Sequence, residues 1–375
     1  MRDEAGSGFS KFGDERTQNA VDHRDQIDYG LEARAVTSKT GNVEETSKLF
    51  DTYPFLNMIG PNQFLPDDVL PGHRSLVLQW LALCQDVAHN LTSALEVALG
   101  TRPGELVRIL DGDDGRARTT STAGFERLDA RYRFARMKTI RYPTARHIDG
   151  IARLDGSRQG VGAHKDGGWI TLLATSPHRG LQVQSLSGEW LDVAHDPQGM
   201  IVNFGQQMER VSRGAISAAT HRVVSGDTAS VQGDRFSVAY FSMPALDAIV
   251  EPIAATSLCA AIVEAWQRAQ AERRRATGQE DVVTDVPRGD LWGGDDTPFG
   301  WQAWRGITRS HRTCPRACLR ELALTPSCPC SQRGGTVWIR RIDVFMCGLC
   351  MYTSEDMYKR RVNVCVEMQG VRSGS

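Results

Sequence analysis

Three side chains of types that bind iron stand at a characteristic spacing in the middle of the chain. His164 and Asp166 are separated by one residue, and His221 follows much farther along the sequence. On a strand, residues i and i+2 point to the same face, so His164 and Asp166 can bind one ion together. His221 would complete a set of two histidines and one carboxylate. Such a set leaves coordination positions open for a substrate and dioxygen, and it suits non-haem Fe(II).

A second pair of reactive side chains lies at the end of this region. Arg235 and Ser237 are also separated by one residue. By the same strand rule they share a face, with Phe236 and Val238 on the opposite one. A guanidinium can bind a carboxylate through two parallel hydrogen bonds, and a hydroxyl can add another. The pair therefore predicts a position that binds a carboxylate.

At these residues the chain resembles a known family, the Fe(II)/2-oxoglutarate-dependent dioxygenases of the isopenicillin N synthase-like group. The order and spacing of seven short motifs fit that family, and the resemblance extends over roughly residues 11–311. The motifs are RYP at 141–143, GVGAHKD at 160–166, GLQVQ at 180–184, GEWLDV at 188–193, VNFG at 202–205, HRVV at 221–224 and RFS at 235–237.

The resemblance implies a set of roles for these residues. It implies that His164, Asp166 and His221 bind Fe(II), and that 2-oxoglutarate chelates the ion through its 1-carboxylate and keto oxygen. The far carboxylate of 2-oxoglutarate would be bound by Arg235, Ser237 and the hydroxyl of Tyr142. Dioxygen and 2-oxoglutarate would be consumed as co-substrates, with succinate and CO2 as products, while a small organic molecule is oxidised. We assign no catalytic residue beyond the metal ligands, because the cofactor carries the difficult chemistry.

Two positions beside the motifs depart from the family pattern. The family usually reads NxGD after the strand that contains Asn203, and here Gln206 replaces the aspartate. Hydrogen bonds from outside the ligand set orient metal ligands, so this change either weakens iron binding or is neutral, since an amide also accepts hydrogen bonds. Lys165 stands where relatives often carry threonine. We expect it to face away from the metal and to be solvated.

The segment from Met137 to Val250 has the pattern of short strands separated by turns. The expected strands are 137–142, 169–175, 180–184, 189–194, 199–204, 218–224 and 235–242. Regularly spaced short strands are typical of a sandwich or barrel, and among these the jelly roll closes around a small-molecule site. The resemblance implies the same double-stranded β-helix. The predicted fold is therefore mainly β with flanking α-helices.

The clearest helix is expected from Pro71 to Leu99. Apolar residues recur there every three or four positions, at Leu76, Trp80, Leu83, Val87, Leu91, Leu95 and Leu99. Such a stripe favours packing on the outside of a sheet, and a coiled-coil partner is the weaker alternative because the stripe is short. Residues 257–275 and 299–312 predict two further helices.

The chain divides by composition into four regions. Residues 1–70 are expected to form a partial, partly disordered N-terminal region, because residues 1–48 are polar and the strand and helix that open the family domain are not recognisable. Residues 71–136 would form a helical support region and residues 137–312 the jelly-roll oxygenase domain. Residues 313–375 would form an atypical cysteine-rich tail.

The tail contains seven of the nine cysteines. Cys347 and Cys350 have the C-x-x-C spacing of zinc ligands, which is one interpretation. However, Cys314 and Cys318 are spaced more widely and no matched histidine pair follows, so a four-ligand site is incomplete. We prefer the interpretation that the tail is disordered or alternatively spliced.

Charge and hydropathy exclude several classes of function. The chain has 44 basic and 45 acidic residues, so no net charge favours nucleic acid or an anionic membrane as a partner. No apolar run is long enough to span a membrane, and the N-terminus lacks the apolar stretch of a secretory signal. Before the tail there are only Cys84 and Cys259, which suits a reducing compartment. We expect a cytosolic, monomeric protein with a small-molecule substrate.

Two alternatives to a 2-oxoglutarate-dependent enzyme remain open. One is an oxidase like isopenicillin N synthase, in which Arg235 and Ser237 would bind a carboxylate of the substrate and no co-substrate acid is needed. The other is a non-catalytic jelly-roll protein that keeps metal binding. Succinate production that depends on 2-oxoglutarate would distinguish a 2-oxoglutarate-dependent dioxygenase from both alternatives.

Overall fold

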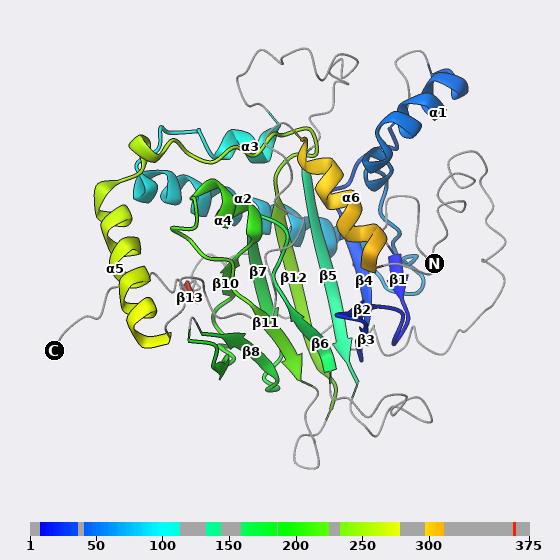
Figure 1. The fold of residues 1–375 in the computed structure, drawn as a ribbon. Coiled ribbons are helices and arrows are strands. Elements are labelled where there is room, and N and C mark those ends of the chain that lie inside the picture. Colours follow the sequence, from blue (N-terminus) through cyan, green and yellow to red (C-terminus); the bar gives the residue numbers. More distant parts are fainter. Residues whose placement is uncertain are drawn as a thin grey trace.

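Two β-sheets lie face to face and are flanked by helices (Figure 1). The computed structural model of this 375-residue chain describes residues 8–36, 41–112, 133–143, 159–185, 187–224, 233–277, 297–310 and 363–364. Within those residues, the larger sheet has the strand order β1 (Gly8–Ser10), β4 (Asp25–Gly30), β5 (Phe134–Tyr142), β12 (Arg235–Met243), β7 (Ile170–Thr175), β10 (Ile201–Phe204), β13 (Asn363–Val364). The smaller sheet has the order β6 (Gln159–His164), β11 (His221–Val224), β8 (Leu181–Gln184), β9 (Trp190–Asp192).

Strand pairing confirms the predicted fold class. Neighbouring strands are antiparallel in both sheets except for the parallel pair β10–β13. The crossing of the chain between the two sheets is that of a jelly roll, the double-stranded β-helix. A two-stranded hairpin, β2 (Arg16–Thr17) and β3 (Ala20–Val21), lies beside β6.

Each strand expected from the sequence is present, with ends shifted by a few residues. One strand, β6, was missing from the predicted set, although the argument for the metal ligands assumed a strand there. His164 is the last residue of β6, and Asp166 lies beyond the end of the strand. The two side chains therefore come together through a turn at the strand end, and strand alternation alone does not explain it.

The expectation that the N-terminal strand is missing was wrong. β4 pairs with β5 from Asp25–Arg141 to Gly30–Arg136, and β1 pairs with β4. This strand could not be recognised in the sequence because its buried positions are polar. The Asp28 carboxylate lies 3.5 Å from Lys138 Nζ, and Asp25 forms an ion pair with Arg141, so charge pairing replaces the usual apolar alternation. The region expected to be loop also contains helix α1 (Val43–Thr52) and the short 3-10 helix η1 (Pro54–Met58).

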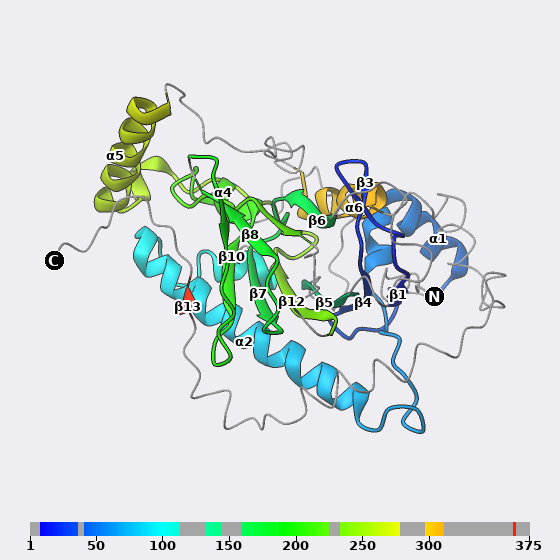
Figure 2. The same ribbon diagram turned by 90° about the horizontal axis from the view of Figure 1, so that it is seen from below.

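Helix α2 (His73–Leu99) covers the outer face of the larger sheet, where it contacts β7 and β12 (Figure 2). The helix ends as predicted at Leu99, and Gly100 caps it with a φ of 79° in the left-handed region. Its most buried line is offset from the predicted apolar stripe. The residues of that line are His73, Val77, Leu81, Cys84, Ala88, Thr92, Glu96 and Leu99.

The polar residues on this buried line have partners, which is why they are tolerated. Glu96 accepts hydrogen bonds from the backbone N–H groups of Gly104, Leu106 and Val107, at the start of α3 (Val107–Asp111). Thr92 accepts one from the indole N–H of Trp169, which follows Asp166 by three residues. Of the predicted stripe, five residues are partly buried and pack against the same core, and Leu99 is buried in it; the five are Leu76, Trp80, Val87, Leu91 and Leu95.

The remaining helices are α4 (Gln206–Val211), α5 (Ala260–Thr277), α6 (Phe299–Ser310) and the short 3-10 helix η4 (Ala255–Ser257). Helices α5 and α6 confirm the two predictions made for residues 257–275 and 299–312, up to residue 310. Apart from β13, the cysteine-rich tail lies outside the described residues, and so do Cys347 and Cys350. No helix in the described ranges is both long and apolar enough to span a membrane.

Two apolar clusters hold these layers together. The larger one lies between α2, α6 and the outer face of the larger sheet. The smaller one lies between the two sheets and consists of Ile140, Tyr142, Val161, Leu181 and Val223, with Leu173, Val193 and Ile201 packed against it. The second cluster is the apolar interior next to the predicted site.

Candidate metal centre

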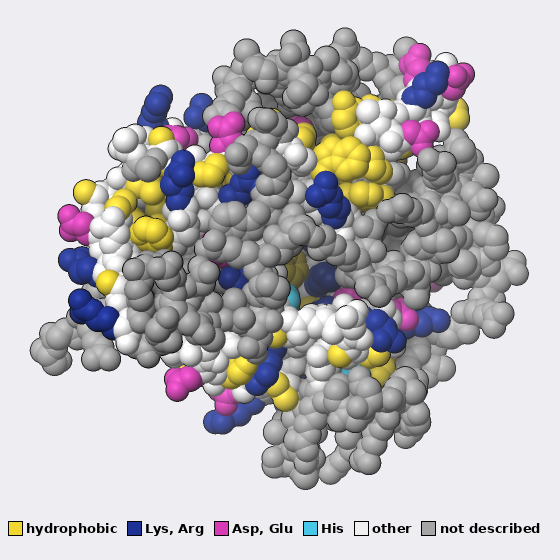
Figure 3. Space-filling view, in the orientation of Figure 1, with side chains coloured by type: hydrophobic (Ala, Val, Ile, Leu, Met, Phe, Trp, Pro, Cys, Tyr) yellow, Lys and Arg dark blue, Asp and Glu magenta, His cyan; other side chains and the backbone are white. Residues whose placement is uncertain are grey.

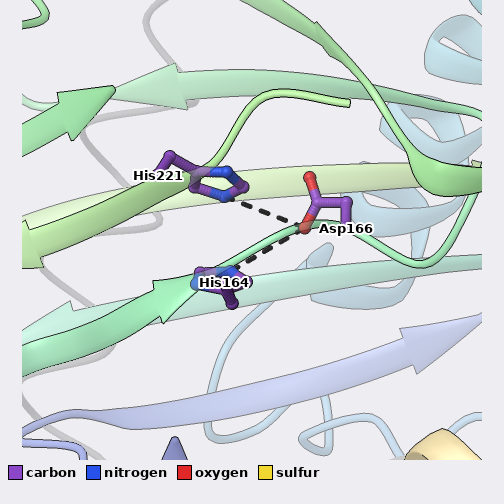
Figure 4. A group of neighbouring side chains, drawn as sticks. All are labelled: His164, Asp166 and His221. Atoms are coloured by element: carbon purple, nitrogen blue, oxygen red, sulfur yellow. Dashed lines mark ion pairs between the residues drawn. The ribbon is translucent and has the colours of Figure 1, made fainter. Parts of the chain in front are cut away.

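His164, Asp166 and His221 converge at one end of the space between the sheets (Figure 4). Strands β6 and β11 are neighbours, and His164 and His221 face each other directly across that pair. Their ring centroids are 4.2 Å apart. One ligand atom from each of the three residues lies within 4.8 Å of the others, a spacing at which a single ion can be bound. The structure thus brings together the three residues that the sequence singled out.

Backbone hydrogen bonds fix which nitrogen of each histidine faces the site. Nδ1 of His164 lies 2.8 Å from the carbonyl of Gly162, and Nδ1 of His221 lies 3.0 Å from the carbonyl of Ala219. A carbonyl can only accept, so each Nδ1 must carry the proton and donate. Each Nε2 then keeps its lone pair, and each lies 3.8 Å from Oδ1 of Asp166. The lone pairs are therefore available to a metal ion.

The carboxylate of Asp166 is oriented by two side chains of the larger sheet. Its Oδ2 accepts hydrogen bonds from the hydroxyl of Thr171 at 2.6 Å and from the amide of Asn203 at 2.8 Å. Thr171 and Asn203 are cross-strand partners on β7 and β10, so one row of the sheet supplies both donors. This arrangement leaves Oδ1 turned toward the histidines.

Protonation states at the site also favour a metal ion. Burial opposes ionisation of Asp166, but the neighbouring imidazoles and the hydrogen bonds from Thr171 and Asn203 outweigh it, so the pKa of this carboxyl is lowered. Desolvation by the surrounding protein, together with His221, lowers the pKa of His164 to about 3. A carboxylate and a neutral imidazole are the forms that bind a metal.

The turn that carries Asp166 is held by backbone contacts with the start of α4. The N–H of Gln206 donates to the carbonyl of Asp166 at 2.8 Å, and the N–H of Gln207 donates to that of Gly168 at 3.0 Å. A Cβ on Gly205 would lie 2.3 Å from the carbonyl oxygen of Gly168, so only glycine permits this approach. Gln206 acts here through its backbone N–H, whereas Thr171 and Asn203 orient the Asp166 carboxylate.

The expectation that Lys165 is solvated was wrong. Its side chain is only 6% exposed, and its Nζ lies 3.4 Å from Oε2 of Glu209 in α4. Burying an ammonium group is costly unless it is paired, and Glu209 supplies the partner. Nothing in the sequence motif indicated this contact, because the two residues are far apart in the chain.

The predicted carboxylate-binding residues also lie together. Arg235 is the first residue of β12 and Tyr142 the last residue of β5, and the two are direct cross-strand partners. The guanidinium carbon of Arg235 lies 4.9 Å from the centroid of the Tyr142 ring. Ser237 is on the same face two residues along β12 and is also buried. All three side chains therefore line the interior between the sheets.

Arg235 is a buried cation with free hydrogen-bond donors. It is 7% exposed, and its Nε and Nη1 have no hydrogen-bond partner among the described residues. Burial lowers the pKa of the guanidinium, which remains charged all the same. Arg141, on the opposite face of β5, is instead bound by the Asp25 carboxylate. Among the described residues Arg235 has no such carboxylate partner, so its Nε and Nη1 donors are available to an anion.

The sequence did not identify Thr171, Asn203 or Glu209 as supporting residues. A signal for the first two existed, since both are polar residues on strands whose neighbouring positions are apolar. In Figure 3 a small histidine surface is visible near the middle of this face, with basic and apolar side chains beside it.

Comparisons with known proteins agree with this geometry. Residues 134–244 match the family model of the 2OG-Fe(II) oxygenase superfamily. Over 73% of its length the chain is 27% identical to the 2-oxoglutarate-dependent dioxygenase frbJ of a Dothideomycetidae species, and over 66% it is 27% identical to a homoarginine-6-hydroxylase of Glycine max. It covers 63% of the length of each relative.

A solved structure of a 2OG-Fe(II) oxygenase family protein from Caulobacter crescentus is also similar. It aligns with a TM-score of 0.48 and 18% identity, over 81% of this chain and 76% of that one.

Proposed function

We propose that this chain, whose residues 134–244 belong to the 2OG-Fe(II) oxygenase superfamily, is an Fe(II)- and 2-oxoglutarate-dependent dioxygenase that oxidises a small organic molecule. The observation that carries the proposal is the pairing of two sites in one interior. A ligand set of two histidines and one carboxylate lies at one end, and a buried arginine with free donors lies on the inner face of the larger sheet. A 2-oxo diacid needs both, because it binds a metal through one end and presents a carboxylate at the other.

The residues present fit the metal. His164 and His221 offer neutral Nε2 atoms, and Asp166 offers an oriented carboxylate oxygen. Two imidazoles and one carboxylate on one side of an ion leave its other positions for exchangeable ligands, which suits Fe(II) oxygenases. When bound, Fe(II) supplies the activation of dioxygen that a protein side chain cannot supply.

The residues present also fit the far carboxylate of 2-oxoglutarate. Arg235 can donate from Nε and Nη1, and Ser237 and Tyr142 add hydroxyl groups nearby. The surrounding side chains of Ile140, Val161, Leu181 and Val223 are apolar and exclude water, which strengthens a charge-assisted contact. In the overall reaction, 2-oxoglutarate loses CO2 and one oxygen atom enters succinate. The other oxygen atom enters the organic substrate in a hydroxylation, or is reduced to water in a desaturation or ring closure.

The substrate class is proposed at the level of a small organic molecule, oxidised by hydroxylation, desaturation or ring closure, in specialised metabolism. Similarity to a hydroxylase of homoarginine and to a proline hydroxylase of Petromyces alliaceus supports small substrates. We also propose a cytosolic location, supported by the free thiols of Cys84 and Cys259.

The test is to incubate the purified protein with Fe(II), dioxygen and 2-oxoglutarate and to measure succinate. Oxygenases of this type release some succinate even without their organic substrate, so the assay does not require that substrate to be known. We expect succinate in an amount that depends on 2-oxoglutarate and is lost in Asp166→Ala. Oxygen consumption without 2-oxoglutarate would support the oxidase alternative, and metal binding without any turnover would support a non-catalytic protein.

A further inference from the structure

One carboxylate oxygen links the two chain segments that carry the metal ligands. Oε2 of Glu209 lies 3.4 Å from Nζ of Lys165, the residue between His164 and Asp166. The same oxygen accepts a hydrogen bond from the backbone N–H of Ala218 at 3.0 Å. Ala218 begins the short segment that leads to His221. Both ligand segments are therefore bound to the same atom of α4.

The environment of this contact is buried on all sides. The side chains of Lys165 and Glu209 are each 6% exposed, and every residue of α4 is buried. The backbone of Glu209 is fixed as well, because its N–H donates to the carbonyl of Gly205. Since α4 also holds the Asp166 turn through the N–H groups of Gln206 and Gln207, it forms a rigid support beneath the site.

We propose that Glu209 and Lys165 are positioning residues for the metal: their ion pair, together with the Glu209–Ala218 hydrogen bond, fixes the separation of His164 and Asp166 from His221. This inference rests on the proposed function, since it assumes that the three residues bind a metal. Neither Lys165 nor Glu209 supplies one of the three ligand atoms, so their effect on the metal is indirect.

The separation of the metal ligands has to be fixed because they come from two different chain segments. His164 and Asp166 are on one segment and His221 is on another, and a metal ion is bound tightly only when all three atoms are already at the right distance. Metal ligands are commonly oriented by hydrogen bonds and ion pairs with residues that do not touch the metal. Removal of such an interaction typically lowers metal affinity 10- to 100-fold. A buried ion pair adds little net stability over apolar side chains, so positioning is a better account of its presence than stability.

The experiment compares Lys165→Met, Glu209→Gln and the double variant with wild type. Fe(II) dissociation constants are measured anaerobically by competition with a coloured chelator, and Tm is measured without metal. In Glu209→Gln, Lys165 is left as a buried charge without a partner, so this variant should lose both stability and Fe(II) affinity. The double variant has no uncompensated charge, so its Tm should return toward wild type.

The double variant distinguishes a positioning role of the ion pair from a purely structural one. We expect its Fe(II) dissociation constant to stay about 10- to 100-fold above wild type even though its Tm recovers. Asp25→Asn is the matched control, because it breaks a similarly buried ion pair, Asp25–Arg141, away from the triad. It should lower Tm without changing Fe(II) affinity.

Two results would overturn the proposal in different ways. If Fe(II) affinity recovered together with Tm in the double variant, the ion pair would be merely structural. If wild type itself bound no Fe(II), the proposed function would fail, and the positioning role with it.

Discussion

Replacing Arg235 should weaken 2-oxoglutarate binding specifically, by an amount that follows from its free donors. Nε and Nη1 are buried and have no partner in the described part of the chain, so Arg235 has donors available for the far carboxylate. Hydrogen bonds to charged groups contribute about 1.5–3 kcal/mol each. Two of them amount to about 3 kcal/mol at the lower bound, and each 1.4 kcal/mol is about tenfold. Arg235→Ala should therefore raise the apparent constant for 2-oxoglutarate on the order of a hundredfold.

The replacement that keeps the charge should be intermediate. Arg235→Lys retains an ammonium group but loses the planar fork that donates two parallel hydrogen bonds, so an increase of about tenfold is expected. Arg141→Lys is the matched control, because Arg141 lies on the neighbouring strand and is bound by Asp25. It should leave the 2-oxoglutarate constant unchanged. The assay is succinate formation against 2-oxoglutarate concentration with Fe(II) saturating.

The same residue allows a second, independent readout. A buried guanidinium without an anion costs free energy, so Arg235→Met should leave the Tm of the protein without 2-oxoglutarate unchanged or higher. Addition of 2-oxoglutarate and Fe(II) should then stabilise wild type much more than the variant. The reasoning would be refuted if Arg235→Ala changed only the constant of the organic substrate, or if Arg235→Met were strongly destabilised without ligand.

Three further predictions concern the metal and the tail. His164→Ala, Asp166→Ala and His221→Ala should each abolish turnover and leave the fold largely intact; near-wild-type turnover of Asp166→Ala at matched iron would disprove the ligand assignment. Thr171→Val removes a hydrogen-bond donor that lowers the pKa of Asp166, so this pKa should rise. Because Fe(II) binding requires the ionised carboxylate, the variant should lose Fe(II) at a higher pH than wild type when the pH is lowered. An unchanged pH profile of Fe(II) affinity would contradict this. Truncation after Arg312 should change Fe(II) affinity and Tm little, since in the described part of the tail only the two-residue strand β13 pairs with the domain; a large loss of soluble protein would show that the tail packs on the core.

The parts of the fold that could be predicted were those with local signals. The strands from β5 to β12 contain apolar residues and are separated by turns, and the spacing of Arg235 and Ser237 places both on one face of a strand. His164 and Asp166 were also predicted to lie together, although a turn at the end of β6 brings them together. Helix α2 was predicted from its period, but its buried line was placed wrongly. Thr92 and Glu96 are buried there because partners from other elements satisfy them.

What could not be predicted depended on contacts between distant residues. Strand β4 has polar side chains on its buried face, and the ion pairs of Asp28 with Lys138 and of Asp25 with Arg141 make that burial acceptable. Lys165 was expected in solvent because it should face away from the metal ligands, and Glu209, which neutralises it, is distant in the sequence. In each case a charged residue was predicted to be exposed, because the residue of opposite charge that pairs with it is distant in the sequence.

The most direct test of the central claim is an anaerobic titration of the protein with Fe(II) and 2-oxoglutarate, followed by visible spectroscopy. Chelation of protein-bound Fe(II) by a 2-oxo acid gives a weak metal-to-ligand charge-transfer band. We predict a band in wild type that saturates at one equivalent of Fe(II) per chain, that is absent in Asp166→Ala and that requires much more 2-oxoglutarate in Arg235→Ala. A wild-type protein that shows no such band, or one that develops equally in Asp166→Ala, would contradict the account.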